Sequence, residues 1–589
     1  MKRNTTTFIR AAVQATVALT LIFGLFLIVH RGLRSGERRL HVLSTNDVHG
    51  AWFDSTYVGD RVRPSLMAVN YYVDSLRKAV GRRNVVLLDA GDCLQGDNAA
   101  YYYNYVATGE PHLFPELVSY MGYDAIAVGN HDVETGHQVY DRVSALLRRK
   151  GVPFLAGNAV RNDNGKPYWP DYKVLHRAGL KILVLGYTNA NMAAWLGEDI
   201  WSGMHFESLI PMVQGRVDEL RRKLRPDVVI VAVHSGTGRG DGKELESQGL
   251  DLYRSLEGVD FLLCSHDHRP FIECDGTKAL MNSGSRAQHI CHGTLSVRMR
   301  RGRPASRVVT AGMIDVDAGK ADPAMKARFA GAYRDVKAFT LREVGEIACP
   351  LDMKEAFTGP CAMVNLIHLV QLGASGADVS FAAPLSQRGH IDAGKVVFND
   401  MFTIYLYENT LFKIRLTGAQ IRSYLEFSYD KWIRTPDRSD PHVLRIVSRP
   451  DPRFGRDRWS FENRSYNFDS AAGLNYTIDV SKPFGQRVAI SGMAGGREFD
   501  ENATYTVAMT SYRAAGAGGL LGSGAGVDPS KLEIVDKYPE IRDLIYDYFL
   551  RQGKVTEEML FDGDVLGSWR FEPAVAAEKA LKADLSLLF

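Results

Sequence analysis

The sequence has few cysteines and little net charge. Its 589 residues include six cysteines, none of which form a C-x-x-C pair, so their spacing predicts neither a disulfide framework nor a metal site made of thiolates. The formal net charge is +3, and no basic stripe with interleaved aromatic residues occurs. We therefore expect no nucleic-acid partner.

Long apolar runs are absent from most of the chain. The composition, with 45% hydrophobic and 24% charged residues, is that of a globular protein. A chain of 589 residues is too long for one ordinary hydrophobic core, so we expect two domains.

The exception is an apolar run near the start of the chain, residues 11–29, which basic residues flank on both sides. It is long enough to span a bilayer and rather long for a signal-peptide core, and no convincing cleavage site follows. We interpret residues 1–39 as an N-terminal signal anchor, with a cleaved signal peptide as the alternative. Both interpretations predict an extracytoplasmic protein, in the periplasm or at the cell surface. The anchor also predicts attachment to the membrane through this segment.

From residue 40 onwards, short apolar runs alternate with polar clusters and helical patterns. Residues 64–80, for example, begin with a proline and have apolar residues at helical spacing. Five runs have the length and bulk of buried strands in a parallel sheet. They are residues 40–45, 85–88, 125–128, 227–233 and 261–264.

Each of these five runs is followed by side chains that can bind a metal. They are Asp47 and His49, Asp92, Asn130, His234, and the pair His266 and His268. Taken singly, each has an ordinary interpretation as a turn, a helix cap, a core histidine or a solvated histidine. Five in consecutive α/β units favour one shared site, because open α/β sheets bind ligands at the carboxyl ends of their strands. Mixed oxygen and imidazole donors suit two divalent ions such as Mn, Zn, Fe or Co, which can activate a water and hold a phosphoryl oxygen.

These residues also form recognisable motifs. In chain order they are NDVHG from Asn46, GDCLQG from Gly91, GNHDVE from Gly129, the single His234, and SHDH from Ser265. The set resembles the calcineurin-like metallophosphoesterases, and specifically their 5′-nucleotidase branch, over residues 40–316. The resemblance implies an α/β fold, a four-layer β-sandwich flanked by helices, followed by an α+β 5′-nucleotidase C-terminal domain. It places the catalytic domain at 40–320, a linker helix at 321–340 and the substrate-binding domain at 341–589.

The resemblance also implies roles for the motif residues. One metal site would use Asp47, His49, Asp92 and His268. The other would use Asp92, Asn130, His234 and His266, so that Asp92 bridges the two ions. His131 would be the catalytic imidazole. Glu134, which stands where the family usually has aspartate, would orient it.

In the second domain the resemblance covers both secondary structure and substrate contacts. Residues 363–367 resemble the opening of a helix, residues 399–409 a strand pair, and residues 416–418 the start of a second helix. Tyr512, in the glycine-rich segment TSYRAAGAGGLL, would stack on a nucleotide base. Phe468 would be a second ring, although either aromatic could instead belong to the core.

Arg388 stands where the family has an arginine on the substrate. Two other positions depart from the family, because Ala383 replaces an asparagine and Gly518 replaces the aspartate that usually holds the ribose hydroxyls. The loss of that carboxylate argues against strict recognition of the nucleoside, without affecting the metal chemistry.

Taken together, the motifs predict a two-metal phosphohydrolase that cleaves phosphate monoesters, above all those of nucleotides, outside the cytoplasm. The same site could instead act on 2′,3′-cyclic nucleotides, nucleotide sugars or a non-nucleotide ester. A third alternative is a membrane-tethered binding protein whose catalytic site has decayed. The complete ligand set and the presence of His131 argue against it.

Overall fold

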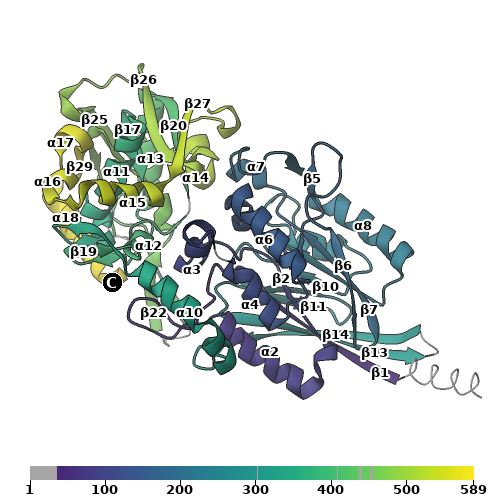
Figure 1. The fold of residues 1–589 in the computed structure, drawn as a ribbon. Coiled ribbons are helices and arrows are strands. Elements are labelled where there is room, and N and C mark those ends of the chain that lie inside the picture. Colours follow the sequence, from purple (N-terminus) through teal and green to yellow (C-terminus); the bar gives the residue numbers. More distant parts are fainter. Residues whose placement is uncertain (1–35, 110, 301–302, 408, 437–440, 452–455) are drawn as a thin grey trace, which may run out of the picture. The chain divides into compact units, whose positions relative to one another are not determined.

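The computed structural model describes residues 36–589, except 110, 301–302, 408, 437–440 and 452–455. The apolar run predicted to anchor the chain therefore lies outside the described residues. Within them, no helix is both long and apolar enough to cross a bilayer. The chain divides into two compact units, residues 1–336 and 337–589, and the division falls within the helix α10 (Pro323–Thr340) (Figure 1).

Two six-stranded sheets form the centre of the first unit. The first sheet has the order β14 (Arg303–Asp315), β13 (His289–Arg300), β1 (Gly36–Thr45), β2 (Val85–Asp89), β3 (Ala125–Ala127) and β4 (Phe154–Leu155). The second has the order β11 (Pro270–Cys274), β12 (Ala279–Ser283), β10 (Phe261–Leu263), β9 (Val228–Val233), β7 (Leu180–Tyr187) and β6 (Tyr172–Arg177).

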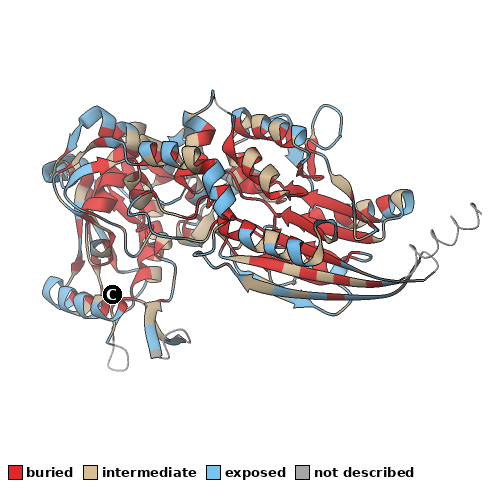
Figure 2. Ribbon diagram, turned by 60° about the horizontal axis from the view of Figure 1, so that its bottom comes forward, coloured by how far each residue is buried: buried red, intermediate tan, exposed pale blue. Residues whose placement is uncertain are grey.

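All five strands expected from the apolar runs are present, as β1, β2, β3, β9 and β10. Within each sheet the neighbouring members of this set run parallel, and every residue of β2, β3, β9 and β10 is buried (Figure 2). Burial on both faces explains why these strands are continuous apolar runs instead of alternating patterns. Parallel pairing also brings their carboxyl ends to the same edge of each sheet.

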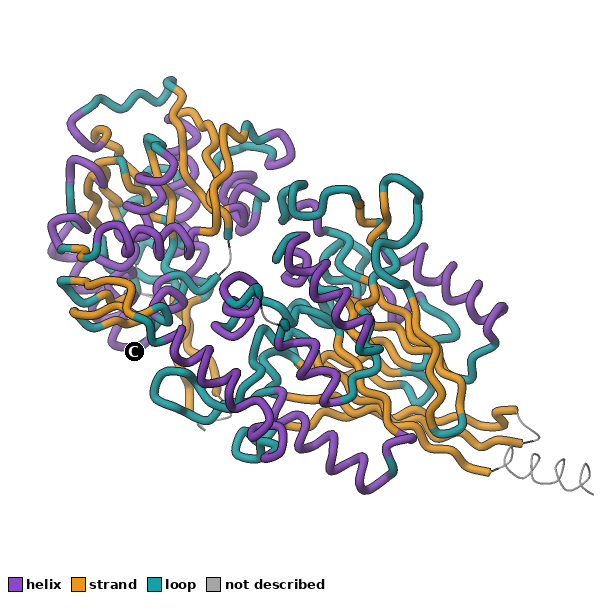
Figure 3. The backbone as a smooth tube through the Cα atoms, viewed as in Figure 1, coloured by secondary structure: helices purple, strands orange, loops and turns teal. Residues whose placement is uncertain are grey.

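Helices cover the outer face of each sheet, as Figure 3 shows. Those against the first sheet are α2 (Leu66–Val80), α4 (Leu113–Met121), α6 (His137–Arg149) and α10, and those against the second are α8 (Leu209–Leu224) and α9 (Gly249–Ser255). A separate apolar core lies between the two sheets and includes Val42, Leu88, Ile230 and Leu263. The expected four-layer sandwich is therefore confirmed.

The second unit has an α+β fold, as expected. Its main sheet has the order β23 (Ser470–Ala472), β17 (Val379–Ala382), β26 (Thr504–Thr510), β20 (Thr410–Thr417) and β27 (Ile534–Glu540). Two three-stranded sheets accompany it, β19 (Gly394–Val397), β15 (Glu343–Ile347) and β28 (Lys554–Val555), and β25 (Val488–Met493), β24 (Leu474–Asp479) and β29 (Gly567–Glu572). The longer helices are α11 (Ala362–Ser375), α13 (Gly418–Trp432), α15 (Ile541–Gln552) and α18 (Ala574–Leu588).

Two of the three expected local structures in this unit are confirmed. The helix α11 contains residues 363–367, and α13 begins after Thr417, whose side chain accepts a hydrogen bond from the backbone N–H of Gln420. The strand pair expected over 399–409 is wrong, because a short helix, α12 (Asp400–Ile404), lies there. The Asp400 carboxylate accepts the backbone N–H of Val397, 2.8 Å away, and an acidic residue in the first turn favours a helix.

Candidate metal centre

The structure brings the seven expected ligands together at the carboxyl edge of the two sheets. Two groups of side chains have ligand atoms that all lie within 4.8 Å of one another. The first group is Asp47, His49 and His268, and the second is Asp92, His234 and His266. Each group combines residues from both sheets, so the centre depends on the packing of the sandwich.

In the first group, two imidazoles face one another beside a carboxylate. The Nε2 atoms of His49 and His268 are 2.9 Å apart. The Asp47 Oδ1 atom lies 3.9 Å from the first and 3.7 Å from the second. Ring nitrogens that converge on a buried carboxylate form a donor set suited to a divalent cation.

In the second group, the amide of Asn130 joins the three charged or titratable side chains. Its Oδ1 atom lies 2.9 Å from both His234 Nε2 and His266 Nδ1. The Asp92 Oδ2 atom is 3.1 Å from His234 Nε2. This group therefore also offers mixed oxygen and imidazole donors.

The backbone at the centre adopts an unusual conformation. Five of the seven expected ligands have a positive φ, between 47° and 70°: Asp47, His49, Asp92, His266 and His268. Left-handed backbone costs a non-glycine residue about 1–3 kcal/mol, and such residues cluster at functional sites. The conformation turns the chain sharply at the strand ends, so that side chains from successive positions reach the same small volume.

One glycine allows two of these turns to pack closely. A Cβ atom at Gly129 would lie 2.0 Å from Asp92 Oδ1. Only glycine at this position permits the loop after β3 to contact the Asp92 carboxylate, which in turn accepts the backbone N–H of His131 at 2.9 Å.

The histidines are oriented by contacts of their second ring nitrogens. The Nδ1 atom of His234 lies 2.9 Å from the carbonyl of Ala90, and Nδ1 of His49 lies 3.2 Å from the carbonyl of Gln95. When Nδ1–H donates to a carbonyl, Nε2 is left free to bind a metal. These contacts fix both ring orientation and tautomer.

Burial lowers the pKa of three of the four candidate imidazole ligands. Burial lowers the pKa of His266 to about 3, and it holds the pKa values of His49 and His268 below their usual range. These rings are therefore neutral, which is the form that binds metals. At His234, burial also lowers the pKa, but the negative charge of the Asp92 carboxylate outweighs burial and raises the pKa to about 9.

The pKa values of the two candidate carboxylate ligands, Asp92 and Asp47, shift in opposite directions. Burial raises the pKa of Asp92, but the charges of His234 and His131 outweigh burial and hold it well below its usual value. At Asp47 burial dominates and raises the pKa well above its usual value. A bound cation would reverse that shift. A fully buried carboxylate beside neutral imidazoles is costly unless a cation compensates it, so these residues fit a metal site.

His131 and Glu134 lie next to this centre on the short helix α5 (Asn130–Glu134). The Nδ1 atom of His131 is 2.7 Å from Glu134 Oε2, and its ring centroid is 5.3 Å from that of His49. About a third of the His131 side chain is exposed, so the ring can contact a substrate. Glutamate at this position reaches the imidazole in the way that the family's aspartate would.

Asp132, which is not among the residues expected from the sequence, also contributes to the centre. Its buried carboxylate accepts four backbone N–H groups, those of Asp92, Cys93, Leu94 and Gly129, at 2.8–3.0 Å. It thereby joins the loops after β2 and β3, which carry Asp92 and Asn130. Its place inside the GNHDVE motif was the available signal.

The three residues expected to bind substrate lie in the second unit. Arg388 lines a cavity of about 480 Å³ together with Phe402, Thr403 and Leu406. Tyr512 is 39% exposed. The expectation for Phe468 is wrong, because this ring has no exposed surface. It stacks on Trp432 with a centroid distance of 5.5 Å, so it belongs to the core and cannot contact a base.

Two other tyrosines form a cluster with Tyr512 instead. The ring of Tyr466 is 6.3 Å from that of Tyr512, and Tyr407 is 5.8 Å from Tyr466. Tyr407 is 39% exposed. Local sequence does not indicate that these rings cluster, because they come from three segments far apart along the chain.

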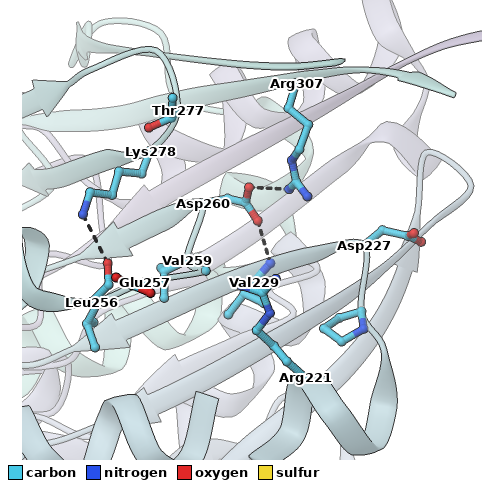
Figure 4. A pocket seen from close by; sticks show the side chains of 12 residues that line it. Arg221, Asp227, Val229, Leu256, Glu257, Val259, Asp260, Thr277, Lys278 and Arg307 are labelled. Atoms are coloured by element: carbon cyan, nitrogen blue, oxygen red, sulfur yellow. Dashed lines mark hydrogen bonds and ion pairs between the residues drawn. The ribbon is translucent and has the colours of Figure 1, made fainter. Parts of the chain in front are cut away.

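A further cavity lies at the opposite edge of the second sheet, where β9 and β10 begin (Figure 4). Its volume is about 470 Å³, and its charged lining is balanced, with three cationic and three anionic side chains. Arg307 donates to Asp260, and Lys278 donates to the carbonyl of Leu256. This cavity is therefore separate from the metal centre, and at least three of its charged groups, those of Arg307, Asp260 and Lys278, make contacts within the fold.

Comparison with known proteins agrees with this geometry. Residues 40–270 match the family model of the calcineurin-like phosphoesterases, and residues 343–522 match that of the 5′-nucleotidase C-terminal domain. A 2′,3′-cyclic-nucleotide 2′-phosphodiesterase/3′-nucleotidase of Haemophilus influenzae is 22% identical, covering 92% of this chain and 88% of the relative.

Solved structures show the same fold. A candidate 5′-nucleotidase of Staphylococcus aureus, solved with α-ketoglutarate, has a TM-score of 0.71 at 20% identity, covering 90% of this chain and 99% of that one. A 5′-nucleotidase precursor of Thermus thermophilus has a TM-score of 0.57 at 19% identity, with the same coverage. The chain therefore combines a calcineurin-like phosphoesterase domain with a 5′-nucleotidase C-terminal domain.

Proposed function

We propose that this protein hydrolyses phosphate esters of nucleotides at a pair of divalent metal ions. The observation that carries the proposal is the convergence of seven oxygen and imidazole donors from five strand ends in one buried centre. The first ion would be held by Asp47, His49, Asp92 and His268. The second would be held by Asp92, Asn130, His234 and His266.

When bound, the ions would supply Lewis acidity toward the phosphoryl oxygens and an activated water. The protein residues would do the rest of the chemistry. Water attacks phosphorus, the bond from phosphorus to the ester oxygen breaks, and the leaving oxygen takes a proton. His131 would donate that proton or stabilise the transferring group, and its contact with Glu134 supports this role because the carboxylate orients the ring.

The second unit would recognise the base. Tyr512 presents an exposed ring on which a base can stack, and Tyr466 places an edge next to it at an interplanar angle of 86°. Stacking of this kind tolerates different bases and contributes about 1–3 kcal/mol for each base. Gly518 offers no carboxylate to the ribose, so we expect poor discrimination between ribose and deoxyribose.

A second candidate activity uses the same centre. The Haemophilus influenzae relative, which spans 92% of this chain, is named for 2′,3′-cyclic nucleotides and 3′-nucleotides. This similarity favours hydrolysis of a phosphate on the ribose 2′ or 3′ oxygen. Nucleotide sugars and non-nucleotide esters are further possible substrates of the same site.

A substrate panel with purified protein and manganese tests these proposals. The panel contains a 5′-nucleotide, a 3′-nucleotide, a 2′,3′-cyclic nucleotide, a nucleotide sugar and ribose 5-phosphate, which lacks a base. We expect at least one nucleotide to have a higher kcat/KM than ribose 5-phosphate, and Tyr512→Ala to remove that preference by raising KM. An unchanged nucleotide KM in this variant would exclude base recognition by Tyr512 and favour a non-nucleotide ester.

We also place the protein outside the cytoplasm, attached to the membrane by its N-terminal segment. The basic flanks and apolar length of residues 11–29 support this proposal. Recovery of the intact chain in the soluble fraction of lysed cells would contradict the attachment.

A further inference from the structure

The tyrosines proposed to contact the base are carried by short, irregular segments. Tyr512 lies on α14 (Ser511–Ala514), a helix of four residues, and Tyr466 lies in a single 3₁₀ turn, η4 (Ser465–Asn467). Helical segments this short are not stable by themselves. The distance between the two rings must therefore be set by contacts that join the segments.

Arg513, the neighbour of Tyr512, provides such contacts. Its guanidinium is almost completely buried, with 3% of the residue exposed. Nε and Nη2 each donate to one carboxylate oxygen of Asp469, both at 2.9 Å, in a bidentate pair. Asp469 is itself 2% exposed and accepts a further hydrogen bond from the Tyr424 hydroxyl.

The remaining donors of Arg513 bind both tyrosine-bearing segments. Nη2 donates to the carbonyl of Tyr466. Nη1 donates to Asn467 Oδ1 and to the carbonyl of Ala517, both at 3.0 Å. One planar group thus fixes the turn that carries Tyr466 relative to the loop that carries Tyr512.

Stability alone does not account for this arrangement. A buried ion pair often adds no stability relative to apolar residues of the same size, because desolvation of both charges opposes their attraction. The fork of a guanidinium does impose a fixed geometry on all its partners, which a lysine ammonium cannot do. The contacts of Arg513 are those expected of a group that orients two segments.

We propose that Arg513 is a positioning residue that fixes the spacing of the Tyr466 and Tyr512 rings and thereby sets the affinity for the nucleotide base. The inference rests on the proposed function, since it concerns the base site of that reaction. Arg513 has no role at the metal ions, so its replacement should change KM for nucleotides and leave kcat nearly unchanged.

The test uses the full-length protein and the conservative variant Arg513→Lys, which keeps the charge but loses the fork. We expect KM for the best nucleotide to rise about tenfold, within the range that one stacked base supplies. KM for ribose 5-phosphate and kcat for both substrates should stay within about twofold. Arg422→Lys is the matched control, because Arg422 pairs with Glu501 at 2.7 Å on the surface of the same unit, and it should change none of these constants.

A double variant separates positioning from a general structural effect. If Arg513 acts through the ring, Arg513→Lys should have no further effect on nucleotide KM in a protein that already carries Tyr512→Ala. Additive effects, or an equal rise of KM for ribose 5-phosphate, would overturn the inference. If Arg513→Lys does not fold, Asp469→Asn replaces it, because this variant removes one acceptor oxygen of the bidentate pair and keeps the arginine. The same KM and kcat values are then measured.

The unmodified protein separates this inference from the proposed function. If it hydrolyses ribose 5-phosphate but no nucleotide better, the proposed base site itself is refuted before any variant is compared. If nucleotides are preferred and Arg513→Lys leaves their KM unchanged, the proposed function stands and only the positioning role fails.

Discussion

At the scale of single residues, Asp92 connects the two groups of candidate ligands. Its carboxylate lies 3.1 Å from His234 Nε2, and its charge partly offsets the effect of burial on the pKa values of His49 and His268. The residue therefore acts electrostatically on both groups. A shared carboxylate is a common way to hold two ions close together.

Asp92→Ala should therefore remove both ions and essentially all turnover. Removing the carboxylate that we propose to be shared would leave each ion with fewer oxygen donors and a less negative environment. Metal analysis of the purified variant checks the prediction, with the surface variant Asp218→Ala as control. Retention of two ions per chain would contradict the bridging role.

His131→Ala should have a different effect, because its imidazole is paired with Glu134 and is assigned to the phosphoryl group. We expect both ions to remain and kcat to fall about 10²–10⁴-fold, the range of general acid–base catalysis. Glu134→Gln should give a smaller decrease, because the ring keeps a hydrogen-bond partner. An unchanged kcat in His131→Ala would show that the imidazole is structural.

At the scale of elements, Asp132 joins the loops that follow two neighbouring strands. In Asp132→Asn one acceptor oxygen becomes an NH₂ group that faces backbone N–H donors. Leaving buried donors without acceptors costs about 1–3 kcal/mol for each group. We expect a lower melting temperature and weaker metal binding, measured by calorimetry and by titration with manganese. Unchanged metal affinity would show that the two loops keep their positions without this carboxylate.

The helix α11 contributes a pH-sensitive contact to the second unit. Its His368 is fully buried and lies 2.9 Å from Ser380 Oγ on β17 and 3.2 Å from Ser470 Oγ on β23. Burial lowers its pKa from 6.5 to about 3. Between these values the unfolded chain binds a proton that the folded chain does not, so stability falls as the pH drops below about 6.5.

The free energy of unfolding of this unit, measured by chemical denaturation at a series of pH values from 7 to 4, should show this loss. His368→Gln should have a smaller slope of unfolding free energy against pH, because glutamine does not titrate. Equal slopes in the two proteins would show that other groups cause the acid sensitivity.

Much of the fold and the candidate site of the first unit could be predicted from the sequence. The five apolar runs gave both the strands and the positions of the ligands, because burial on both faces produces a strong signal and ligands at strand ends follow from parallel pairing. The second unit was harder. Phe468 and Tyr466 are two residues apart, and local sequence does not indicate which ring faces the core. Most partners of Arg513 come from a separate segment, residues 466–469, and only the folded chain brings them together.

At the scale of the whole molecule, the two units should respond separately to metal removal. All seven candidate ligands belong to the first unit. Ions that bind only the folded state stabilise it by about 2.7 kcal/mol at a hundred times their dissociation constant. Calorimetry with and without a chelator should therefore show one transition lowered by roughly 5 °C or more and the other unchanged. A shift of both transitions by the same amount would mean that the units unfold together.

The left-handed backbone at five of the ligands has a consequence for mutagenesis and for natural variation. A β-branched replacement would be strongly disfavoured by the positive φ, whatever its chemistry, at Asp47, His49, Asp92, His266 and His268. Alanine would keep a backbone cost of about 1–2 kcal/mol, similar to the cost that the native residue already bears. Glycine removes the ligand atom and also relieves that strain, so an alanine scan reports the loss of coordination more directly than a glycine scan does. Divergent members of this group that have lost the chemistry are accordingly expected to carry glycine or asparagine at these five positions.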